Sequence, residues 1–356
     1  MALCATVQPD RSPIFIVGTG RSGTTLLRLM LCAHPRIYIT HEASFYMWEA
    51  LYSAKAPRRE FLDHYFQTFS FRWLRVDPRR VLDGLPDPLP REHIGAAYAA
   101  VMREKAAQYG RVRFGDKTPA HTDRVHRIFE DFPEAKVVHI YRDPRSTCSS
   151  LARMPWASRS LYANSAFFYE TQRRRTLKFR DRILTVKMEE LLAAPRATMQ
   201  SILDFVGEPW DEAVLDHANH LPARDDMPPL PWLESATRDR ALPPPPWTGL
   251  TPVEVRMIER RNRRLMEELG YAPAPLEAEP GRLAVWWRNV REVPEALRFI
   301  GLYAKIGLRM RDPKHLNSAE TNALFRGLNP PSWSRYPGFE IPQPPPLPAL
   351  PPPAAP

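Results

Sequence analysis

A glycine-bearing turn between an apolar strand and an apolar helix is the first group of residues in this chain that could do chemistry. Residues 13–31 read PIFIVGTGRSGTTLLRLML, so a β-branched and aromatic run leads straight into the turn and then into the helix. Such a turn presents backbone N–H groups and the positive end of a helix dipole to an anion. The sequence therefore predicts an anion site at this turn.

The turn departs from the ordinary phosphate-binding loop at one position. Gly18 and Gly23 hold the two glycine positions of the pattern G-x-x-x-x-G-K-[ST]. Thr25 holds the last position, but Thr24 stands where the lysine should be. That lysine normally reaches the outer phosphates of a nucleoside triphosphate, while the Ser or Thr holds magnesium. Arg21, inside the turn, could supply positive charge as a planar fork that suits a tetrahedral oxyanion.

A second anion site is predicted after another strand. Arg142 ends the run KVVHIYR (136–142), and Asp143 with Pro144 can cap and start the helix that follows. Capping does not require an arginine at the end of the strand, and Ser150 lies on the same helix, eight positions after Arg142. Because ligands bind at the carboxyl ends of parallel strands, both anion sites should lie at one edge of the sheet.

Two more predicted strands end in residues that could move a proton or offset charge. Glu42 and His41 follow RIYIT (36–40), and either side chain could accept a proton. Neighbours on a continuing strand point to opposite faces, so only one of the two should face the site. Lys117, in VRFGDKTP, could stabilise developing negative charge, or it could simply pair with Asp116 or another acid.

The elements that must position these residues alternate between strands and helices. This order predicts an α/β fold, a P-loop-type doubly wound parallel sheet flanked by helices. An aromatic-rich helical region at 45–73 is either ordinary core or a lid over an acceptor. The predicted strands are 14–18, 36–40, the VRFGDKTP run, 136–142 and a run from Ile183; the predicted helices are 23–33, 91–109, 121–131, 195–206 and one from the cap Thr251 to the stop Gly270.

The chain divides into four predicted segments. A flexible N-terminus covers residues 1–12, and the α/β domain covers 13–273. A basic amphipathic helical extension follows at 274–330, and a proline-rich tail, expected to be disordered or polyproline II, covers 331–356. Twelve of the last 27 residues are proline, which can form neither helix nor sheet at that density.

Residues 282–311 combine basic and large apolar side chains in a way that is not typical of a buried helix. The stretch contains seven Arg or Lys and two Glu, interleaved with Trp286, Trp287 and aliphatic residues. A basic amphipathic helix with paired tryptophans is typical of a membrane-surface or partner-binding element. Packing of this helix back onto the domain is the alternative.

Composition and charge limit the classes of protein that need to be considered. The chain has 44% hydrophobic residues, enough for a core, and a net charge of +10, which suits anionic ligands. Cys4, Cys32 and Cys148 have no spacing typical of a disulfide framework, which favours a reducing compartment. We find no secretory h-region and no apolar run long enough for a membrane span. These features predict a cytoplasmic protein, with peripheral contact at a membrane as an addition.

The two anion motifs together resemble those of sulfotransferases that use 3′-phosphoadenosine 5′-phosphosulfate (PAPS). GTGRSGTT resembles their 5′-phosphosulfate loop, and YRDPRSTCSSL resembles their 3′-phosphate motif, in which an Arg and a Ser stand eight positions apart. The R-S-G-T-T form is similar to that of tyrosylprotein and many bacterial sulfotransferases. The resemblance covers about residues 13–273 and implies that the loop binds a phosphosulfate, which needs neither the Walker lysine nor a metal.

The resemblance also implies roles for individual residues. Glu42 stands 21 positions after Arg21, as the catalytic glutamate does in the tyrosylprotein-type family, and would take the acceptor's proton. Cytosolic relatives use histidine, which leaves His41 as the rival base. Arg21 and Lys117 would offset developing charge. Residues that would bind PAPS are Gly20, Arg21, Ser22, Gly23, Thr24 and Thr25 around the phosphosulfate, and Arg142 and Ser150 at the 3′-phosphate.

Two other functions remain compatible with the sequence. A P-loop kinase or NTPase would require the missing lysine and an acidic magnesium ligand. A non-catalytic membrane- or nucleic-acid-binding protein on the same fold would explain the positive charge but not the acids and arginines gathered at one sheet edge. For the sulfotransferase, the acceptor could be a hydroxyl, or an amine, of a small molecule, glycan, lipid or peptide, and no nucleic acid is expected.

Overall fold

The core of the molecule is a parallel β-sheet with the strand order β2-β3-β1-β4-β5. The strands are β1 (Ile14–Gly18), β2 (Ile37–His41), β3 (Arg113–Lys117), β4 (Lys136–Tyr141) and β5 (Ile183–Lys187). The computed structural model describes residues 12–52, 58–83, 85–86, 94–166, 176–220, 226–233, 247, 249–316, 318–335 and 342–347. The predicted doubly wound α/β sheet is therefore confirmed, with strand ends within one or two residues of those expected.

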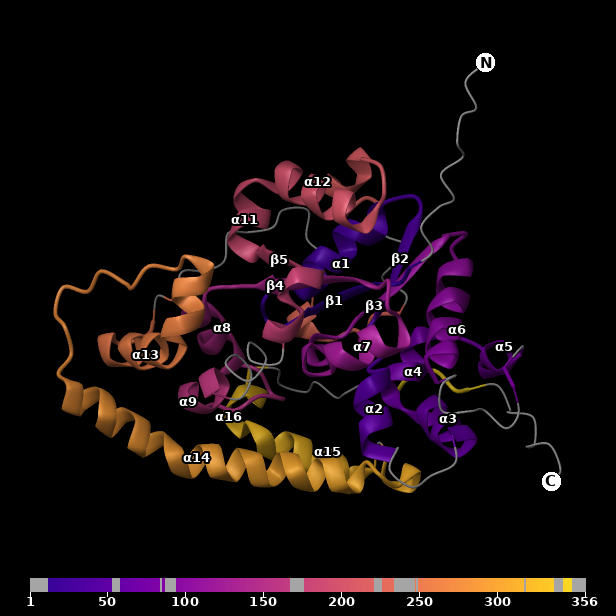
Figure 1. Cartoon of the computed structure of the whole chain (residues 1–356). Coiled ribbons are helices and arrows are strands. Elements are labelled where there is room, and N and C mark those ends of the chain that lie inside the picture. Colours follow the sequence, from indigo (N-terminus) through magenta and orange to yellow (C-terminus); the bar gives the residue numbers. More distant parts are fainter. Residues whose placement is uncertain are drawn as a thin grey trace, which may run out of the picture.

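Helices cover both faces of the sheet, as a doubly wound arrangement requires (Figure 1). On one face lie α1 (Thr24–Ala33) and α12 (Pro195–Val206), and on the other lie α6 (Ile94–Ala107) and α7 (Val125–Asp131). Every residue of β1 is buried, which explains its continuous apolar sequence. The register pairs His41 with Lys117 at the ends of β2 and β3, so their polar residues meet at one edge.

The aromatic region after β2 forms α2 (Phe45–Tyr52), α3 (Arg58–Gln67) and α4 (Phe69–Leu74). Most of its rings are core, as the ordinary interpretation predicted. Phe45 is fully buried and stacks on Tyr98 of α6, with ring centroids 4.4 Å apart. Phe69 and Trp73 are different, because they line the cavity described below.

The helix predicted between Thr251 and Gly270 is present as α13 (Pro252–Leu269). Its N-terminus has a complete capping box, in which the Thr251 hydroxyl accepts from the Glu254 N–H and the Glu254 carboxylate accepts from the Thr251 N–H. Gly270 ends the helix with a φ of 69°, a conformation that glycine adopts without strain.

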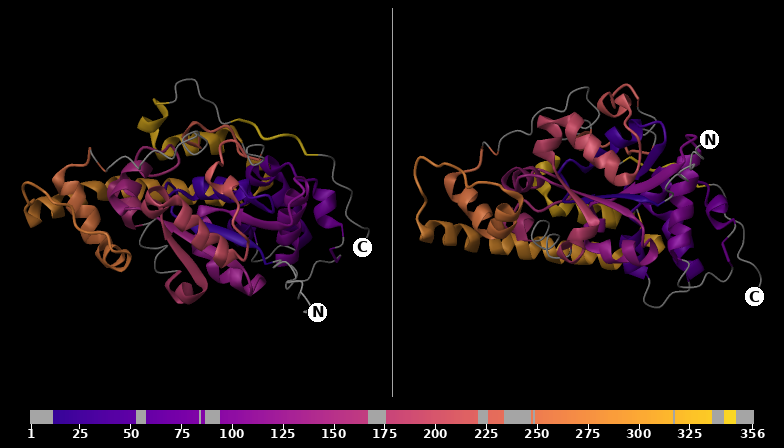
Figure 2. Two further views of the ribbon diagram at one scale, coloured as in Figure 1. Left: turned by 90° about the horizontal axis from the view of Figure 1, so that it is seen from above. Right: turned by 45° about the horizontal axis from the view of Figure 1, so that its top comes forward.

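The C-terminal extension begins with the long helix α14 (Arg282–Arg309), which lies along the outer edge of the molecule in Figure 1 and in the tilted view of Figure 2. It packs against α9 (Leu161–Ala163), α13 and α15 (Ala319–Leu328). Packing onto the domain, one of the two alternatives for this stretch, is therefore observed for one face of the helix. No helix in the described part of the chain is long and apolar enough to cross a membrane.

Part of the proline-rich tail lies against the domain. The expectation that this tail forms no helix is wrong at its start, because residues 331–333 belong to the short helix α16 (Pro330–Trp333), whose first turn accommodates proline. Residues 342–347 have no helix or strand, but Pro344 is buried and Leu347 packs against the core. Arg72 of α4 donates hydrogen bonds of 2.9 Å to the carbonyl oxygens of Pro344 and Pro345. Backbone carbonyls that proline leaves free of a helix or sheet are available to such a donor, and here they hold this segment on the surface of the domain.

The remaining short elements connect these layers. They are α5 (Pro78–Leu82), η2 (Pro119–Arg124), α8 (Pro144–Leu151), η4 (Leu177–Arg182), α11 (Met188–Ala193), η5 (Glu212–Leu215), η7 (Pro313–His315) and α16 (Pro330–Trp333).

Candidate active site

The turn between β1 and α1 is closely packed by neighbouring side chains, which leave room only for glycine at two of its positions. Gly23 has a φ of 98°, and a Cβ there would lie 2.3 Å from the Met188 sulfur. A Cβ on Gly20 would lie 2.7 Å from the Trp156 ring. The Ser22 hydroxyl donates to the Thr19 carbonyl at 2.7 Å. Ser22, which was predicted to bind the donor, therefore stiffens the turn by an internal hydrogen bond. The sequence R-S-G thus fixes a tight backbone loop at the start of α1.

The first turn of α1 fits an anion. Within the described residues, no side chain caps this end of the helix, and no acidic residue occupies its first turn. The N–H groups of the first turn therefore keep their donor capacity and the positive end of the helix dipole. Thr24 and Thr25 begin the helix, and both line the neighbouring cavity.

Arg21 connects the two predicted anion motifs. Its Nε donates to the Ser150 hydroxyl at 3.1 Å, across 129 positions of sequence, and one terminal nitrogen donates to the Trp232 carbonyl at 3.0 Å. Arg142 in turn donates to the Arg21 carbonyl at 3.2 Å. Arg21, Arg142 and Ser150 are therefore one cluster, with two guanidinium groups where the sequence predicted adjoining anion sites.

Glu42 and Lys117 meet at the other side of the turn. Lys117 Nζ donates to Glu42 Oε1 at 2.6 Å and to the Thr25 hydroxyl at 3.4 Å. The lysine side chain is fully buried, whereas that of Glu42 is 43% exposed. Burial lowers the pKa of Lys117, and the charge of Glu42 only partly offsets this. The acid that pairs with Lys117 is Glu42 rather than Asp116, and the pair lies beside the start of α1.

The backbone at Glu42 is strained in a way that the sequence did not predict. Strand β2 ends at His41, and Glu42 has a φ of 49°, a left-handed conformation that is uncommon for glutamate. Because β2 ends at His41, the alternation of side chains along a continuing strand does not decide which of His41 and Glu42 faces the site. Both residues line the cavity, although His41 is almost completely buried.

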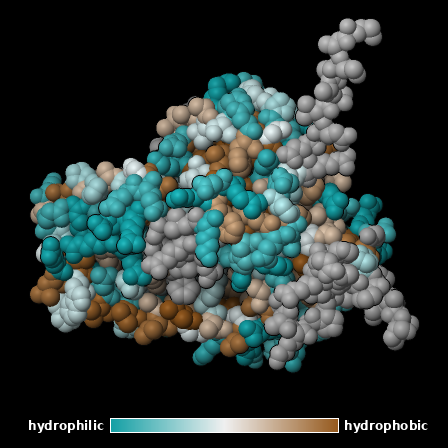
Figure 3. Space-filling model, in the orientation of Figure 1, coloured by the Kyte–Doolittle hydropathy of each residue, from teal (hydrophilic) through white to brown (hydrophobic). Residues whose placement is uncertain are grey.

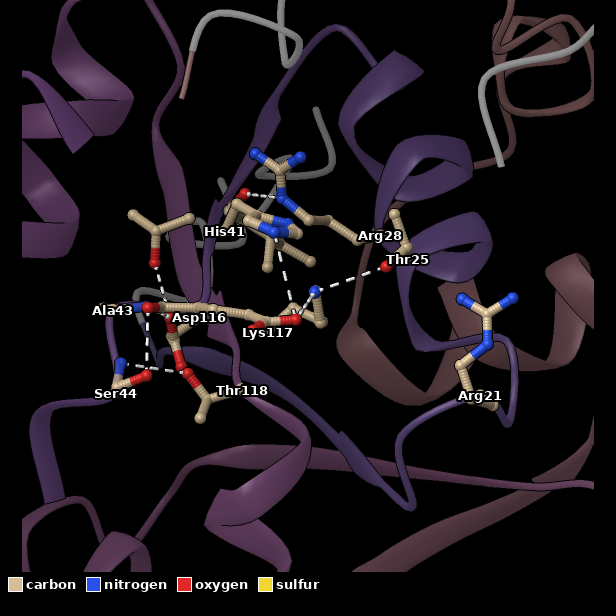
Figure 4. A network of polar contacts seen from close by, with 12 residues as sticks. Arg21, Thr25, Arg28, His41, Ala43, Ser44, Asp116, Lys117 and Thr118 are labelled. Atoms are coloured by element: carbon tan, nitrogen blue, oxygen red, sulfur yellow. Dashed lines mark hydrogen bonds and ion pairs between the residues drawn. The ribbon is translucent and has the colours of Figure 1, made fainter. Parts of the chain in front are cut away.

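Buried polar groups hold the bend at Glu42 in place. Asp116 accepts hydrogen bonds from the Ala43 N–H at 2.9 Å and from the Thr40 hydroxyl at 2.8 Å. Figure 4 shows this network and Lys117 reaching Thr25, with Arg21 apart from it beyond Thr25. Although burial alone would raise it, the pKa of Asp116 is lowered by the nearby His121 imidazole and by the hydroxyls of Thr118 and Thr40. Asp116 thus holds the backbone of the bend through these hydrogen bonds.

A second buried pair, which the sequence analysis missed, supports β2 from behind. Arg28 of α1 lies 2.6 Å from Asp226, and both side chains are fully buried. Arg28 also donates to the Ile39 carbonyl at 2.7 Å, and Asp226 accepts from the His41 N–H at 3.1 Å. The one available signal was an arginine inside the otherwise apolar helix LLRLMLCA, which must find a buried partner.

His41 is unsuited to carry charge in this setting. Burial lowers its pKa well below the ordinary value, and the positive charge of Lys117 adds to the effect. Its Nε2 lies 3.9 Å from Glu42 Oε1. A neutral imidazole beside a more exposed carboxylate leaves Glu42 as the group better placed to receive a proton from a ligand.

Part of the predicted set lines a cavity of about 440 Å³, whereas the remaining predicted residues, Ser22, Gly23, Lys117, Arg142 and Ser150, are not among its lining residues. The predicted residues that line it are Gly20, Arg21, Glu42 and the two threonines of α1. The other lining residues are mainly apolar and come from elements far apart in sequence, which the sequence did not assign to the site. They include Met47, Phe69, Trp73, Leu230, Leu233, Phe299, Tyr303 and Phe325.

The comparisons with known proteins agree with this geometry. A family model described as "Sulfotransferase family" matches residues 13–212, which include the turn, Glu42, Lys117 and the Arg142 motif. The chain belongs to the sulfotransferase family. The described residues contain no group of three or more His, Cys, Asp or Glu that could hold a metal ion.

Relatives within the family include protein-tyrosine sulfotransferases. The chain is 26% identical over 280 residues to "Protein-tyrosine sulfotransferase 1" of Danio rerio, a match that covers 74% of this chain and 73% of that protein. It is 25% identical over 281 residues to "Protein-tyrosine sulfotransferase 1" of Homo sapiens, covering 74% and 70%. The resemblance to tyrosylprotein sulfotransferases drawn from R-S-G-T-T is confirmed.

A solved structure shares the fold. The sulfotransferase domain from the Synechococcus PCC 7002 olefin synthase superposes with a TM-score of 0.54 and 24% sequence identity. The match covers 75% of this chain and 98% of that domain. The region shared with this sulfotransferase domain supports the α/β architecture described above.

Proposed function

We propose that this chain transfers the sulfuryl group of PAPS to an acceptor hydroxyl, with Glu42 as the base. The observation that carries the proposal is the Lys117–Glu42 pair of 2.6 Å beside the start of α1, of which Glu42 lines the same cavity as Arg21. A carboxylate, a buried ammonium and a set of free helix N–H groups are the parts that proton removal and charge stabilisation require.

The residues present fit both phosphate-containing ends of such a donor. Bound PAPS would supply an activated sulfuryl group on its 5′-phosphate and a second phosphate on its ribose. The loop and helix start formed by Gly20, Ser22, Gly23, Thr24 and Thr25 suit the 5′ end, because the first turn of α1 has neither a side-chain cap nor an acidic residue and its N–H groups can donate to an anion. Arg142 and Ser150, joined to the loop through Arg21, suit the 3′-phosphate.

The chain's own groups would then act in a defined order. Glu42 receives the proton as the acceptor oxygen forms its new bond to sulfur and the bond from sulfur to the 5′-phosphate oxygen breaks. Lys117 and Arg21 offset the negative charge that grows on the leaving phosphate oxygen. Adenosine 3′,5′-bisphosphate and the sulfated acceptor leave. An amine acceptor would pass through the same arrangement.

The cavity walls indicate which acceptors suit the site. Aromatic side chains from α4, α14 and α15, together with Leu230 and Leu233, form an apolar wall of the cavity that Glu42 also lines. Such a wall favours an acceptor whose hydroxyl is carried on an apolar or aromatic body, and a phenol, a tyrosine side chain and a lipid all have this character. The free thiols of Cys32 and Cys148 support the proposed reducing, cytoplasmic setting.

Calorimetric titration of the purified protein tests the donor directly. Adenosine 3′,5′-bisphosphate and ATP would each be titrated with and without magnesium. Magnesium-independent binding of the bisphosphate, with weaker binding of ATP, is expected. Preference for ATP with magnesium would overturn the proposal in favour of a P-loop kinase, and binding of neither nucleotide would favour a non-catalytic role.

A further inference from the structure

Helix α14 presents an apolar stripe to solvent. The described residues include ten exposed large hydrophobic side chains, and nine of them lie on α14. Figure 3 shows the hydrophobic surface running along the lower edge of the molecule, where α14 lies in Figure 1. Apart from Tyr303, which lines the cavity, these side chains are what we call the α14 stripe: Leu283, Trp286, Trp287, Val290, Val293, Leu297, Ile300 and Leu308.

Packing within the chain does not explain the stripe. The face of α14 that packs on the domain carries other residues, among them the buried Val285, Phe299 and Ile306. The outward face of a surface helix is normally polar. Leu283 and Leu297 are nonetheless 66% and 64% exposed. A contiguous exposed apolar surface of this kind marks an interaction site.

The unpaired charges along α14 and just after its end are positive. Four exposed basic side chains make no ion pair with any residue the structure describes: Arg282, Arg291, Lys305 and Arg311. The two acidic residues of α14 are already engaged by the domain and by neighbouring arginines. Their contacts are Glu292 with the Ser160 hydroxyl, the Tyr162 N–H and Arg288, and Glu295 with Arg159 and Arg298.

We propose that the α14 stripe binds an anionic lipid surface, with the helix lying in the plane of the headgroups. An apolar stripe flanked by free Arg and Lys, with tryptophans among its apolar residues, is the composition that suits the boundary between headgroups and acyl chains. Trp286 and Trp287 are both exposed and lie with ring centroids 4.9 Å apart. From Leu283 to Leu308 the stripe extends about 38 Å, at 1.5 Å per residue.

A second copy of the chain would bind the α14 stripe less favourably than an anionic lipid surface would. Two α14 helices packed stripe to stripe would bring their unpaired Arg and Lys side chains together, with no acidic residue on either stripe to compensate. Anionic headgroups provide that compensation, and each basic side chain near the surface adds to the attraction. Phe299 and Tyr303, on the same helix, line the cavity, so docking would hold one wall of the acceptor site at the lipid surface.

Vesicle co-sedimentation of the full chain tests this proposal without any measurement of sulfotransfer. The probes are phosphatidylcholine vesicles with and without phosphatidylglycerol. We expect binding to the anionic vesicles only, weakened by added salt. Two triple variants should each lower the partition coefficient by about tenfold or more. They are Leu283→Gln with Leu297→Gln and Leu308→Gln, and Arg282→Gln with Arg291→Gln and Lys305→Gln.

Matched controls separate the stripe from general surface properties. Val112→Gln removes the one exposed large hydrophobic residue that the structure places outside α14. Lys178→Gln with Arg260→Gln and Arg264→Gln removes the same number of exposed charges elsewhere. Both controls should bind vesicles as the wild type does. All variants should keep the wild-type thermal midpoint, since only exposed side chains change.

Three results would overturn the proposal. The first is no binding of the wild type to anionic vesicles. The second is vesicle binding that the stripe variant retains in full. The third is a wild-type dimer in solution that becomes monomeric in the stripe variant and has no affinity for vesicles, which would make a second copy of the chain the occupant.

Discussion

Lys117 Nζ lies 2.6 Å from Glu42 Oε1, so the cation and the carboxylate expected to work on opposite ends of the reaction are in direct contact. The pair also holds the Thr25 hydroxyl at 3.4 Å from the lysine, which connects it to the start of α1. Glu42 remains partly exposed to the cavity while Lys117 is buried behind it. An acceptor entering the cavity would therefore meet the carboxylate first.

Replacing the carboxylate tests its role as base. Glu42→Gln should keep the affinity for adenosine 3′,5′-bisphosphate but lower kcat by roughly 10²–10⁴-fold, the range for loss of general base catalysis. Calorimetry gives the first quantity and a steady-state assay with a phenolic acceptor gives the second. An unchanged kcat would transfer the role to His41, and His41→Asn would then show the loss instead.

The buried lysine predicts an alkaline limb in the pH profile. Burial lowers the pKa of Lys117, so its ammonium is lost at a lower pH than that of an exposed lysine. The value of kcat should fall as pH rises through this lowered pKa, because the positive charge opposite the leaving oxygen disappears. Lys117→Arg keeps its charge and should move the limb to higher pH. An identical limb in both proteins would show that another group titrates.

The lowered pKa of Lys117 also makes the free energy of unfolding depend on pH in a defined direction. Between the lowered pKa of Lys117 in the folded protein and the ordinary value near 10.5, the unfolded chain binds more protons than the folded one. The contribution of Lys117 to the free energy of unfolding therefore rises with pH across that window and is constant below it. Urea denaturation at several alkaline pH values, compared with Lys117→Met, measures this contribution. A slope of the opposite sign would mean that the lysine is more readily charged in the folded state.

The 3′-phosphate role of Arg142 can be tested by choice of ligand. Arg142→Ala should weaken binding of adenosine 3′,5′-bisphosphate by roughly 1.5–3 kcal/mol for each charged hydrogen bond lost. Affinity for adenosine 5′-monophosphate, which lacks the 3′-phosphate, should barely change. Calorimetry on both ligands provides the comparison. Equal losses for the two ligands would show that Arg142 acts through the Arg21 carbonyl that it contacts, and not on the phosphate.

Much of the sheet and of the anion loop could be predicted because the signals are local. The run IFIVG, the turn and the helix lie next to one another in sequence, and each strand that carries a site residue ends in polar groups. Pairing between distant segments has no such signal. The contact of Arg21 with Ser150 spans 129 positions, and the left-handed backbone at Glu42 invalidated an argument based on strand alternation.

The cavity walls were not predicted for a related reason. Phe299 and Tyr303 belong to a helix whose apolar residues fall on more than one face, so periodicity alone cannot tell which side chains meet the site. Asp226 lies in a proline-rich connection with no periodic pattern at all. Only the burial of Arg28 shows that this aspartate is needed, because a charge inside the domain requires a partner.

The Arg28–Asp226 pair should be important for stability although neither residue touches the cavity. Asp226→Asn leaves the fully buried Arg28 guanidinium without its counter-charge and weakens the bond to the His41 N–H. Breaking one partner of such a pair costs about 3–5 kcal/mol of unfolding free energy. Chemical denaturation measures this cost, with Glu212→Gln as the control, since the Arg196–Glu212 pair is exposed and its loss should leave the midpoint unchanged. Similar midpoints for the two variants would show that Arg28 finds other acceptors, such as the Ile39 carbonyl, and that Asp226 is not required to hold the end of β2.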